Sequence, residues 1–243
     1  MHALIAIDSF KNSITSIQAN RIVAKRFAAH GITATQVAIA DGGEGTVAAW
    51  LANHVGGQAI TASTVDLAQR PVTATYGYFA TEKMAVIEVA AASGIQFVTT
   101  TLTPLATNTY GTGLLIKDAI ERGARQIILG LGGSGTVDGG AGILRALGYR
   151  FWAADGQELA MTGADLSRVT KIDDRHVLPQ LAEVSFISAA DVTNPLTGPN
   201  GAAKIFGPQK GLPVAQIQAH DAALAHYMTC LLYTSDAADD LLC

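Results

Sequence analysis

The sequence predicts an α/β protein in which mostly parallel strands alternate with helices. Short hydrophobic runs recur along the 243 residues, and most are followed by a segment with apolar residues at helical spacing. Acidic or glycine-rich loops come directly after several of these runs, which is where open α/β sheets bind ligands. Hydrophobic residues make up 49% of the chain and charged residues 15%, so there is enough apolar side chain for a sizeable core.

The elements are expected in a fixed order along the chain. Hydrophobic runs predict strands at 3–8, 34–40, 84–90, 126–130 and 183–191, and two extended runs, 58–65 and 72–79, flank a turn at 66–71. Helical spacing predicts helices at 16–30, at 46–51 after the DGGEG loop, and at 111–122, 138–147 and 214–228. Gly31 and Gly123 stop the first and third of these helices.

Composition excludes several function classes. The net charge of −4 and the lack of a basic run argue against a nucleic-acid partner. No segment approaches the ~20 apolar residues of a membrane helix, and the N-terminus lacks a signal-peptide core, so a cytoplasmic location is expected. None of the six histidines is paired at metal-ligand spacing, and no nucleophile elbow indicates acyl transfer.

The C-terminal residues 229–243 do not fit the rest of the chain. The text CLLYTSDAADD resembles the translated read-through of a sequencing-library adaptor, and the alternative is an ordinary variable terminus. We interpret 229–243 as a non-native tail. Because both cysteines, Cys230 and Cys243, lie in or beyond this string, no disulfide or metal site is inferred from them.

The first candidate element is DSFKNS at 8–13. Asp8 ends the first predicted strand, where a carboxylate can hold a cation or accept a proton from a substrate hydroxyl. Lys11 can neutralise a phosphate or a substrate carboxylate. Taken alone, a helix-capping turn with a solvated lysine explains these residues better.

The second candidate element is DGGEGT at 41–46. Its glycines expose backbone N–H groups at the mouth of a helix, which is an anion site, while Asp41 and Glu44 can instead serve Mg²⁺. The alternative is a plain turn capped by the aspartate. Glycine at 42, 43 and 45 is more than capping requires.

The third candidate element is the glycine-rich run 130–142. Glycine allows a ligand to approach the backbone closely, and Ser134 and Thr136 add hydroxyl donors, so phosphate binding is the natural interpretation. The run matches neither the Walker A pattern nor a clean dinucleotide fingerprint. Close helix–sheet packing explains Gly140 and Gly142 better than it explains Gly132 and Gly133. Two later loops, 191–196 and 206–211, carry Asp191 and Lys210.

Taken in order, these elements resemble the glycerate kinase family of the bacterial glycerate and glucarate pathways. The matching text is IAIDSFKNSI, IADGGEGT, EVAAASGI, NTYGTG, GLGGSGTVDGGAGILRALG and DVTNPLTGPNGAAKIFGPQKG, with Arg70-Pro71-Val72 between them. The resemblance covers residues 3 to about 228. Two positions depart from the family pattern, which usually has Asn at Val137 and Cys at Ala190.

The resemblance implies a two-domain glycerate kinase fold, in which a flavodoxin-like domain is inserted into a discontinuous second α/β domain. Residues 1–66 are expected to form the N-terminal part of the discontinuous domain and 67–228 an incomplete inserted domain. Family members are considerably longer, so the chain resembles a C-terminally truncated kinase. The active site is expected in the cleft between the domains.

The implied reaction is ATP- and Mg²⁺-dependent phosphorylation of D-glycerate, with the 2-position favoured over the 3-position and the oligomeric state open. Asp191 and Asp138 are candidates for the metal or the general base, and Arg70 or Lys210 for the glycerate carboxylate. The remaining candidates are Asp8, Lys11 and Asp41 as catalytic residues, and Gly42, Gly43, Glu44, Gly132, Gly133, Ser134 and Thr136 for substrate or phosphate.

Two rival interpretations remain open. One is a non-catalytic binding protein or an inactive, misfolded fragment, because a truncation that removes strands exposes apolar sheet edges. The other is a kinase that acts on a different small hydroxy acid.

Overall fold

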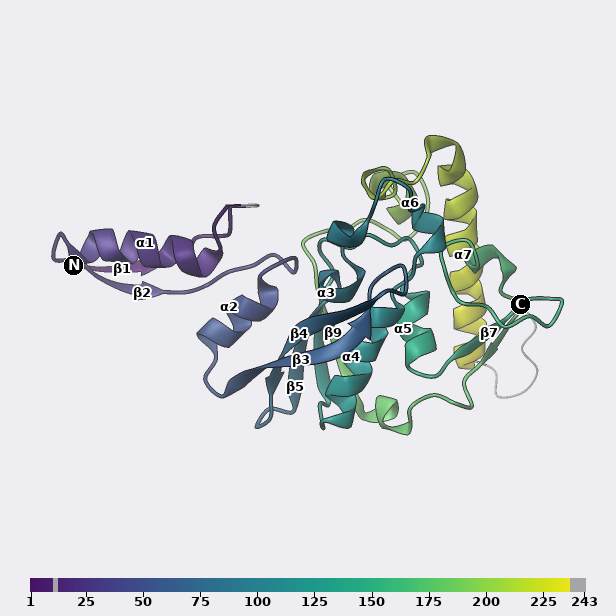
Figure 1. The fold of residues 1–243 in the computed structure, drawn as a ribbon, viewed down its shortest axis with the longest axis horizontal. Helices are drawn as coiled ribbons and strands as arrows, with labels where there is room; N and C mark the ends of the chain where they lie inside the picture. The colour runs from purple at the N-terminus through teal and green to yellow at the C-terminus, as the bar shows by residue number, and fades with distance from the viewer. Residues whose placement is uncertain (11–12, 237–243) are drawn as a thin grey trace.

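The computed structural model describes residues 1–10 and 13–236, and it confirms an α/β fold (Figure 1). Its main sheet has five strands in the order β3-β4-β5-β6-β9. The β3–β4 and β4–β5 pairs are antiparallel, whereas β5–β6 and β6–β9 are parallel. The strands of this sheet are β3 (Gly57–Val65), β4 (Pro71–Phe79), β5 (Met84–Glu88), β6 (Gln126–Gly130) and β9 (Ser185–Ala189).

Helices cover both faces of the main sheet. One face of β5 presents Ala85 and Ile87 to α4, and the other presents Met84 and Val86 to α2. Because β5 is buried on both faces, its sequence is a continuous apolar run, as expected of an inner strand. The helices are α1 (Ser16–Ala28), α2 (Thr46–Asn53), α3 (Ala90–Ser93), α4 (Tyr110–Glu121), α5 (Ala141–Ala146), α6 (Ala202–Ile205) and α7 (Val214–Asp236).

Short 3₁₀ helices connect several of these elements. They are η1 (Ile95–Phe97), η2 (Pro104–Ala106), η3 (Leu166–Arg168), η4 (Pro179–Glu183) and η5 (Pro208–Lys210). The last of these, η5, carries Lys210 to the site described below.

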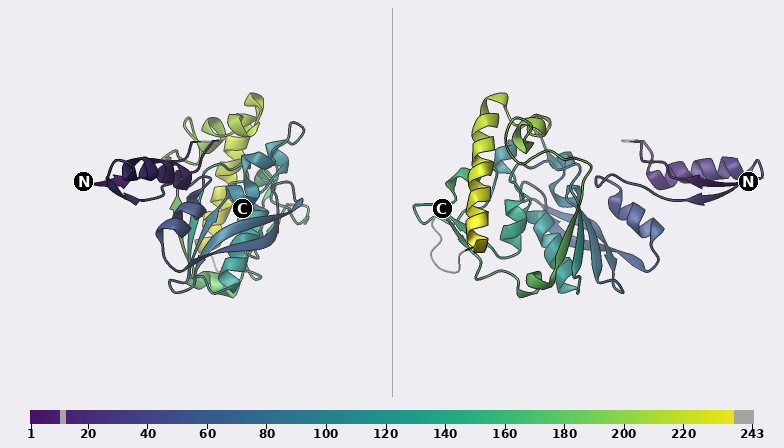
Figure 2. Two further views of the ribbon diagram at one scale, coloured as in Figure 1. Left: turned by 60° about the vertical axis from the view of Figure 1, so that its left-hand side comes forward. Right: turned by 180° about the vertical axis from the view of Figure 1, so that it is seen from behind.

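The N-terminal segment forms a separate layer. Strands β1 (His2–Ile5) and β2 (Thr33–Gln36) pair in parallel with α1 between them. This unit extends away from the main sheet in every view (Figures 1 and 2). It leaves Leu4 69% and Ile22 55% exposed. A two-stranded sheet with uncovered apolar side chains is an incomplete layer.

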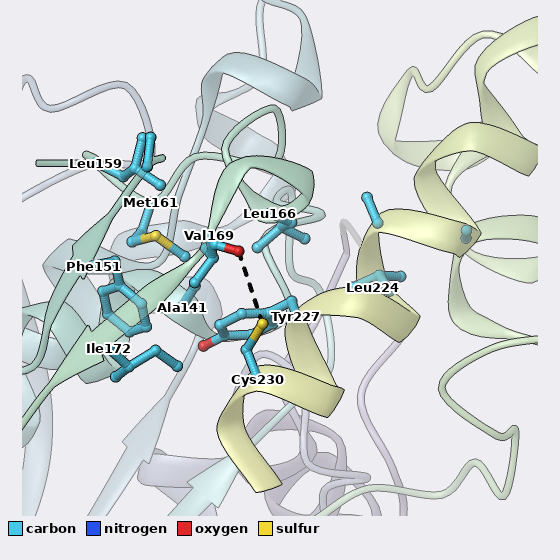
Figure 3. Packing of buried hydrophobic residues seen from close by; sticks show 13 residues of the cluster. Ala141, Phe151, Leu159, Met161, Leu166, Val169, Ile172, Leu224, Tyr227 and Cys230 are labelled. Atoms are coloured by element: carbon cyan, nitrogen blue, oxygen red, sulfur yellow. Dashed lines mark hydrogen bonds between the residues drawn. The ribbon is translucent and has the colours of Figure 1, made fainter. Parts of the chain in front are cut away.

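A second core lies between α5, α7 and the small antiparallel sheet of β7 (Arg150–Trp152) and β8 (Lys171–Asp173). Phe151 and Tyr227 pack at its centre (Figure 3). The Cys230 side chain is fully buried here, with its Sγ 3.8 Å from the carbonyl oxygen of Val169. The adaptor origin of 229–243 stays a prediction, and 237–243 lie outside the described residues.

Most expected elements are confirmed, with shifted ends. The strand predicted at 3–8 stops at Ile5, and the helix predicted from Asp138 begins only at Ala141, because the left-handed Gly139 and Gly140 delay it. The hairpin of β3 and β4 is confirmed along its full length. Strands β7 and β8 were not predicted from the sequence. The division of the chain after residue 66 stays a prediction, although the structure pairs β3 with β4 in one sheet.

Candidate functional site

The candidate site lies at the carboxyl ends of β5, β6 and β9, which are parallel and adjacent. Glu88, Gly130 and Ala189 are the last residues of these strands and stand in register with each other. The loops that follow contain the glycine-rich run and Asp191. Parallel strands place these loops at one edge, the position at which α/β sheets bind ligands.

The DGGEG loop packs directly onto this edge. The Gly132 amide donates a hydrogen bond to the Gly42 carbonyl at 3.0 Å. A Cβ on Gly42 would collide with the carbonyl oxygen of Ala189, and a Cβ on Gly132 would lie 2.6 Å from the Cα of Gly43. These glycines therefore let two backbones touch. Close packing explains Gly142, as predicted from the sequence, and it also explains Gly132, for which packing was the weaker interpretation. The packing role expected of Gly140 is wrong, because a Cβ there would meet nothing within 4 Å; its left-handed φ of 79° is what favours glycine.

The amides at the start of α2 bind a carboxylate from the protein itself. Glu88 Oε1 accepts hydrogen bonds from the amides of Gly45 at 3.1 Å and Val47 at 2.8 Å. Burial raises the pKa of Glu88, and the two amide hydrogen bonds oppose that rise. The anion site expected at this helix mouth is thus filled by Glu88, a residue that sequence reasoning missed.

The glycine-rich loop has adjacent backbone donors available for a ligand. Several backbone groups of this loop are already hydrogen-bonded: the Gly135 amide donates to the Ser93 carbonyl, and the Gly133 carbonyl accepts from the Ile95 amide. Within the part of the chain that the structure describes, the amides of Gly133 and Ser134 donate no hydrogen bond. Gly133 is exposed and has a left-handed φ of 70°. Adjacent unpaired amides on an exposed loop bind anions such as phosphate.

Asp138 is a buried carboxylate of which one oxygen accepts hydrogen bonds from the protein. Its Oδ2 accepts hydrogen bonds from the amide and hydroxyl of Thr109 and from the amide of Gly142, at 2.7–3.0 Å. Its Oδ1 is buried without a hydrogen-bond partner among the described residues. Asp138 therefore ties α4 to α5 and keeps one acceptor for a ligand.

Lys210 reaches the glycine-rich loop from η5. Its Nζ donates to Ser134 Oγ and to the Thr136 carbonyl, each at 2.8 Å. Burial lowers the pKa of Lys210 to about 8, and nearby Asp138 opposes this shift. Lys210, Ser134, Thr136 and Asp138 all line one cavity of about 240 Å³.

The other acidic candidates are exposed. Asp41 and Glu44 lie on the DGGEG loop, and Asp41 Oδ1 accepts from the Gly43 amide at 3.0 Å. Asp191 follows β9, beside the point where Gly42 contacts the strand. These three carboxylates belong to loops that meet at the same edge, and solvent reaches all of them.

Asp8 belongs to the N-terminal layer. It is exposed, and it follows β1 as Asp41 follows β2, so both come after the carboxyl ends of a parallel pair. Ser16 joins the two connections, because its Oγ donates to the Ile7 carbonyl and accepts from the Ile39 amide. Lys11 lies outside the described residues.

Arg70 forms an ion pair within the turn that joins β3 and β4. Its Nε lies 2.6 Å from Asp66 Oδ2 and its Nη2 donates to the Phe97 carbonyl at 3.0 Å. The Asp66 side chain is 2% exposed, so Arg70 neutralises a buried charge. Among the described residues, the side-chain hydrogen bonds of Arg70 go to Asp66 and to Phe97, which lies in η1 after β5. Its role toward glycerate stays a prediction.

Sequence reasoning also missed His220 on α7. It is 4% exposed, lines the cavity, and its Nε2 lies 2.8 Å from the Val137 carbonyl. Burial lowers the pKa of His220, so the ring is neutral and Nε2 is the donor. A helical spacing of apolar residues around a histidine was the sole sequence signal, and it indicates only a buried face.

The described residues contain no group of three His, Cys, Asp or Glu side chains arranged to hold a metal ion. Mg²⁺ is commonly bound by one or two carboxylates together with substrate phosphates, so exposed Asp191 fits such a partial site. Lys210 shares a cavity with Asp138, and its positive charge disfavours a second cation there. The metal role of Asp138 stays a prediction.

Comparison with known proteins shows which family the chain resembles. The sequence profile of the glycerate kinase family matches residues 3–240. Glycerate 2-kinase of Escherichia coli K12 is 42% identical over 230 residues, or 93% of this chain, and glycerate kinase of Bacillus subtilis 168 is 40% identical over 230 residues. A crystal structure from Salmonella typhimurium LT2, described as a candidate glycerate kinase 2, is 37% identical and covers the whole chain with a TM-score of 0.85.

The chain spans about 60% of the length of these curated relatives and 65% of the Salmonella structure. No helix among residues 1–10 and 13–236 is both long and apolar enough to cross a membrane. From the profile match and the 42% identity across 93% of its length, we conclude that the chain belongs to the glycerate kinase family.

Proposed function

We propose that the protein transfers the γ-phosphoryl group of ATP to D-glycerate, with Mg²⁺, and that the 2-hydroxyl is the acceptor. The observation that carries this proposal is the pair of unengaged amides, Gly133 and Ser134, at the edge where β5, β6 and β9 end. The name of the Escherichia coli relative, glycerate 2-kinase, supports the 2-position.

The phosphates are assigned to the glycine-rich loop. The amides of Gly133 and Ser134 donate to phosphate oxygens, and Gly132 and Thr136 hold the loop in place through the Gly42 and Lys210 contacts. Catalysis of phosphoryl transfer consists mostly of positioning and charge neutralisation, which preorganised amides supply.

The proton is assigned to a strand-end carboxylate. The glycerate hydroxyl oxygen bonds to the γ-phosphorus as the bond to the β–γ bridging oxygen breaks, ADP leaves, and Asp191 accepts the hydroxyl proton. Mg²⁺ bound near Asp191 would neutralise charge on the phosphates. The glycerate is assigned to the outer side of this edge, with Asp8, Asp41 and Glu44 as the candidate residues around it. Lys11 stays a candidate from the sequence alone.

We also propose that residues 1–66 belong to a discontinuous domain and 67–228 to the inserted domain. The support is the exposed apolar surface of the N-terminal layer at Leu4 and Ile22, together with the 47% exposed Phe186 on the edge strand β9. Uncovered apolar side chains on a thin layer call for a further covering segment.

The test is turnover of ATP with D-glycerate by the 243-residue chain and by the same chain joined to the remaining part of a relative. We expect phosphoglycerate, with the phosphate on the 2-position by NMR, and lower rates with lactate or glycolate. Asp191→Asn should reduce turnover by about 10²-fold or more, whereas Asp174→Asn on an exposed turn should not. Turnover of another hydroxy acid but not of glycerate would refute the substrate assignment.

A further inference from the structure

The cavity of about 240 Å³ lies beside the glycine-rich loop, between the end of β6, α6 and α7. Its walls are mainly apolar. The larger apolar side chains include Leu131, Ile143, Leu196, Phe206 and Leu224. Such walls favour a flat or apolar group over a three-carbon acid with two hydroxyls.

Two polar groups in this cavity have capacity left for a ligand. Lys210 Nζ carries three N–H donors, and two of them are used by Ser134 and Thr136. Asp138 Oδ1 has no hydrogen-bond partner among the described residues, although Asp138 is only 1% exposed. A buried acceptor left unpaired is costly, so a donor on the ligand is expected at Asp138.

The charges in the cavity cancel. Lys210 contributes one positive charge and Asp138 one negative charge, while burial lowers the pKa of His220 and leaves its ring neutral. A ligand carboxylate here would add a second anion to a site with one cation, and an uncompensated buried charge is strongly unfavourable. The cavity therefore suits a neutral ligand that offers both a donor and an acceptor.

We propose that this cavity binds the purine base of the nucleotide, an assignment that rests on the kinase function proposed above. The exocyclic amine of adenine donates to Asp138 Oδ1, and a ring nitrogen accepts from Lys210 Nζ. The apolar walls pack against the faces of the ring. Ser134 lies both on the cavity wall and on the phosphate loop, so one nucleotide can reach both places. The acid substrate then binds outside the cavity.

The first experiment measures binding of adenosine, inosine and D-glycerate to the 243-residue chain by calorimetry. Adenosine has no phosphate, so this measurement does not depend on catalysis. We expect saturable adenosine binding, competition with ATP, and affinity for inosine lower by about tenfold or more, because its 6-oxygen is an acceptor facing Asp138.

Two substitutions sharpen this test. In Asp138→Asn the amide oxygen takes the place of Oδ2, which accepts three hydrogen bonds, and the amide nitrogen faces the cavity. The preference should then invert toward inosine. Ala202→Leu narrows the cavity and should weaken adenosine binding by about tenfold or more, whereas the matched Ala225→Leu on the exposed face of α7 should not. Thermal unfolding of each variant checks that it is folded.

Absence of saturable adenosine binding by the unmodified chain would overturn the proposal. So would an Ala202→Leu variant that loses D-glycerate binding and keeps adenosine, because the cavity would then be the acid site. Adenosine binding with the expected inversion, but without phosphorylation of glycerate by the completed chain, would keep the base site and refute the kinase function. Phosphorylation of glycerate without adenosine binding would keep the kinase function and refute the base site.

Discussion

The carboxylate of Glu88 accepts a hydrogen bond from the backbone amide of Val47 at 2.8 Å, which joins the end of β5 to the first turn of α2. The same oxygen accepts from Gly45, so one side chain of the sheet caps a helix that has no side-chain cap of its own. This contact holds the DGGEG loop against the strand ends. The geometry of the site therefore depends on Glu88, which touches no proposed substrate.

Glu88→Gln is predicted to be neutral or stabilising at pH 7. Burial raises the folded-state pKa of Glu88 above its unfolded value, so the free energy of unfolding falls as pH rises from about 4.3 toward the folded pKa. Glutamine keeps the acceptor and lacks this penalty. Denaturant unfolding at several pH values should show the variant gaining on the wild type as pH rises through this window.

Glu88→Ala is the matched comparison, because it leaves the amides of Gly45 and Val47 without their acceptor and should cost about 1–3 kcal/mol at every pH. A Gln variant that loses more than about 1 kcal/mol at pH 7 would show that the helix dipole outweighs the burial of the charge.

Gly42→Ala is predicted to destabilise the protein far more than Gly45→Ala. Both glycines have a left-handed φ, which costs an alanine about 1–2 kcal/mol. A Cβ on Gly42 also meets the backbone of Ala189, while a Cβ on Gly45 meets nothing within 4 Å. Denaturant unfolding should give more than about 3 kcal/mol for Gly42→Ala. Equal losses in the two variants would contradict the close packing described here.

The lowered pKa of Lys210 is expected to make the protein more stable as the pH rises above about 8. Its folded pKa of about 8 lies below the unfolded value near 10.4, so between these values the unfolded chain binds a proton that the folded chain does not. The free energy of unfolding should increase across this window by up to about 1.4 kcal/mol per pH unit. Lys210→Met should lose this slope, and parallel curves for the two proteins would show that Lys210 is not desolvated.

Arg70→Met is predicted to lower stability by about 1–3 kcal/mol, because it leaves the buried carboxylate of Asp66 without its cation. The control is Arg122→Met, which breaks an ion pair of the same spacing on the surface with Asp118 and should cost less than about 1 kcal/mol. The KM for glycerate in the completed protein then tests the carboxylate role of Arg70: an unchanged KM would leave it with a structural role.

Local patterns account for the part of the fold that could be predicted. Strand β5 could be predicted because its sequence is a continuous apolar run, and the β3–β4 hairpin because two β-rich runs flank a turn. Three-residue strands such as β7 (Arg150–Trp152) carry too little periodicity to be recognised.

The sequence predicts which loops form the site, but it does not predict the contacts between them. Glu88 and Val47 are 41 residues apart, and nothing in either segment shows that one caps the other. Gly132 has a packing role only because Gly43 lies against it. The burial of Lys210 likewise depends on where η5 packs. Its charge and its place in a loop marked Lys210 as a candidate, but they did not show that its side chain contacts Ser134.

We propose above that the phosphates of the nucleotide bind the amides of Gly133 and Ser134, at the edge where β5, β6 and β9 end. The most direct measurement is amide NMR of the 243-residue chain titrated with ATP and then with adenosine. We expect the amide resonances of Gly133 and Ser134 to shift strongly with ATP and much less with adenosine. If ATP binds and these two amides do not respond, the phosphates lie elsewhere and the proposed site is wrong.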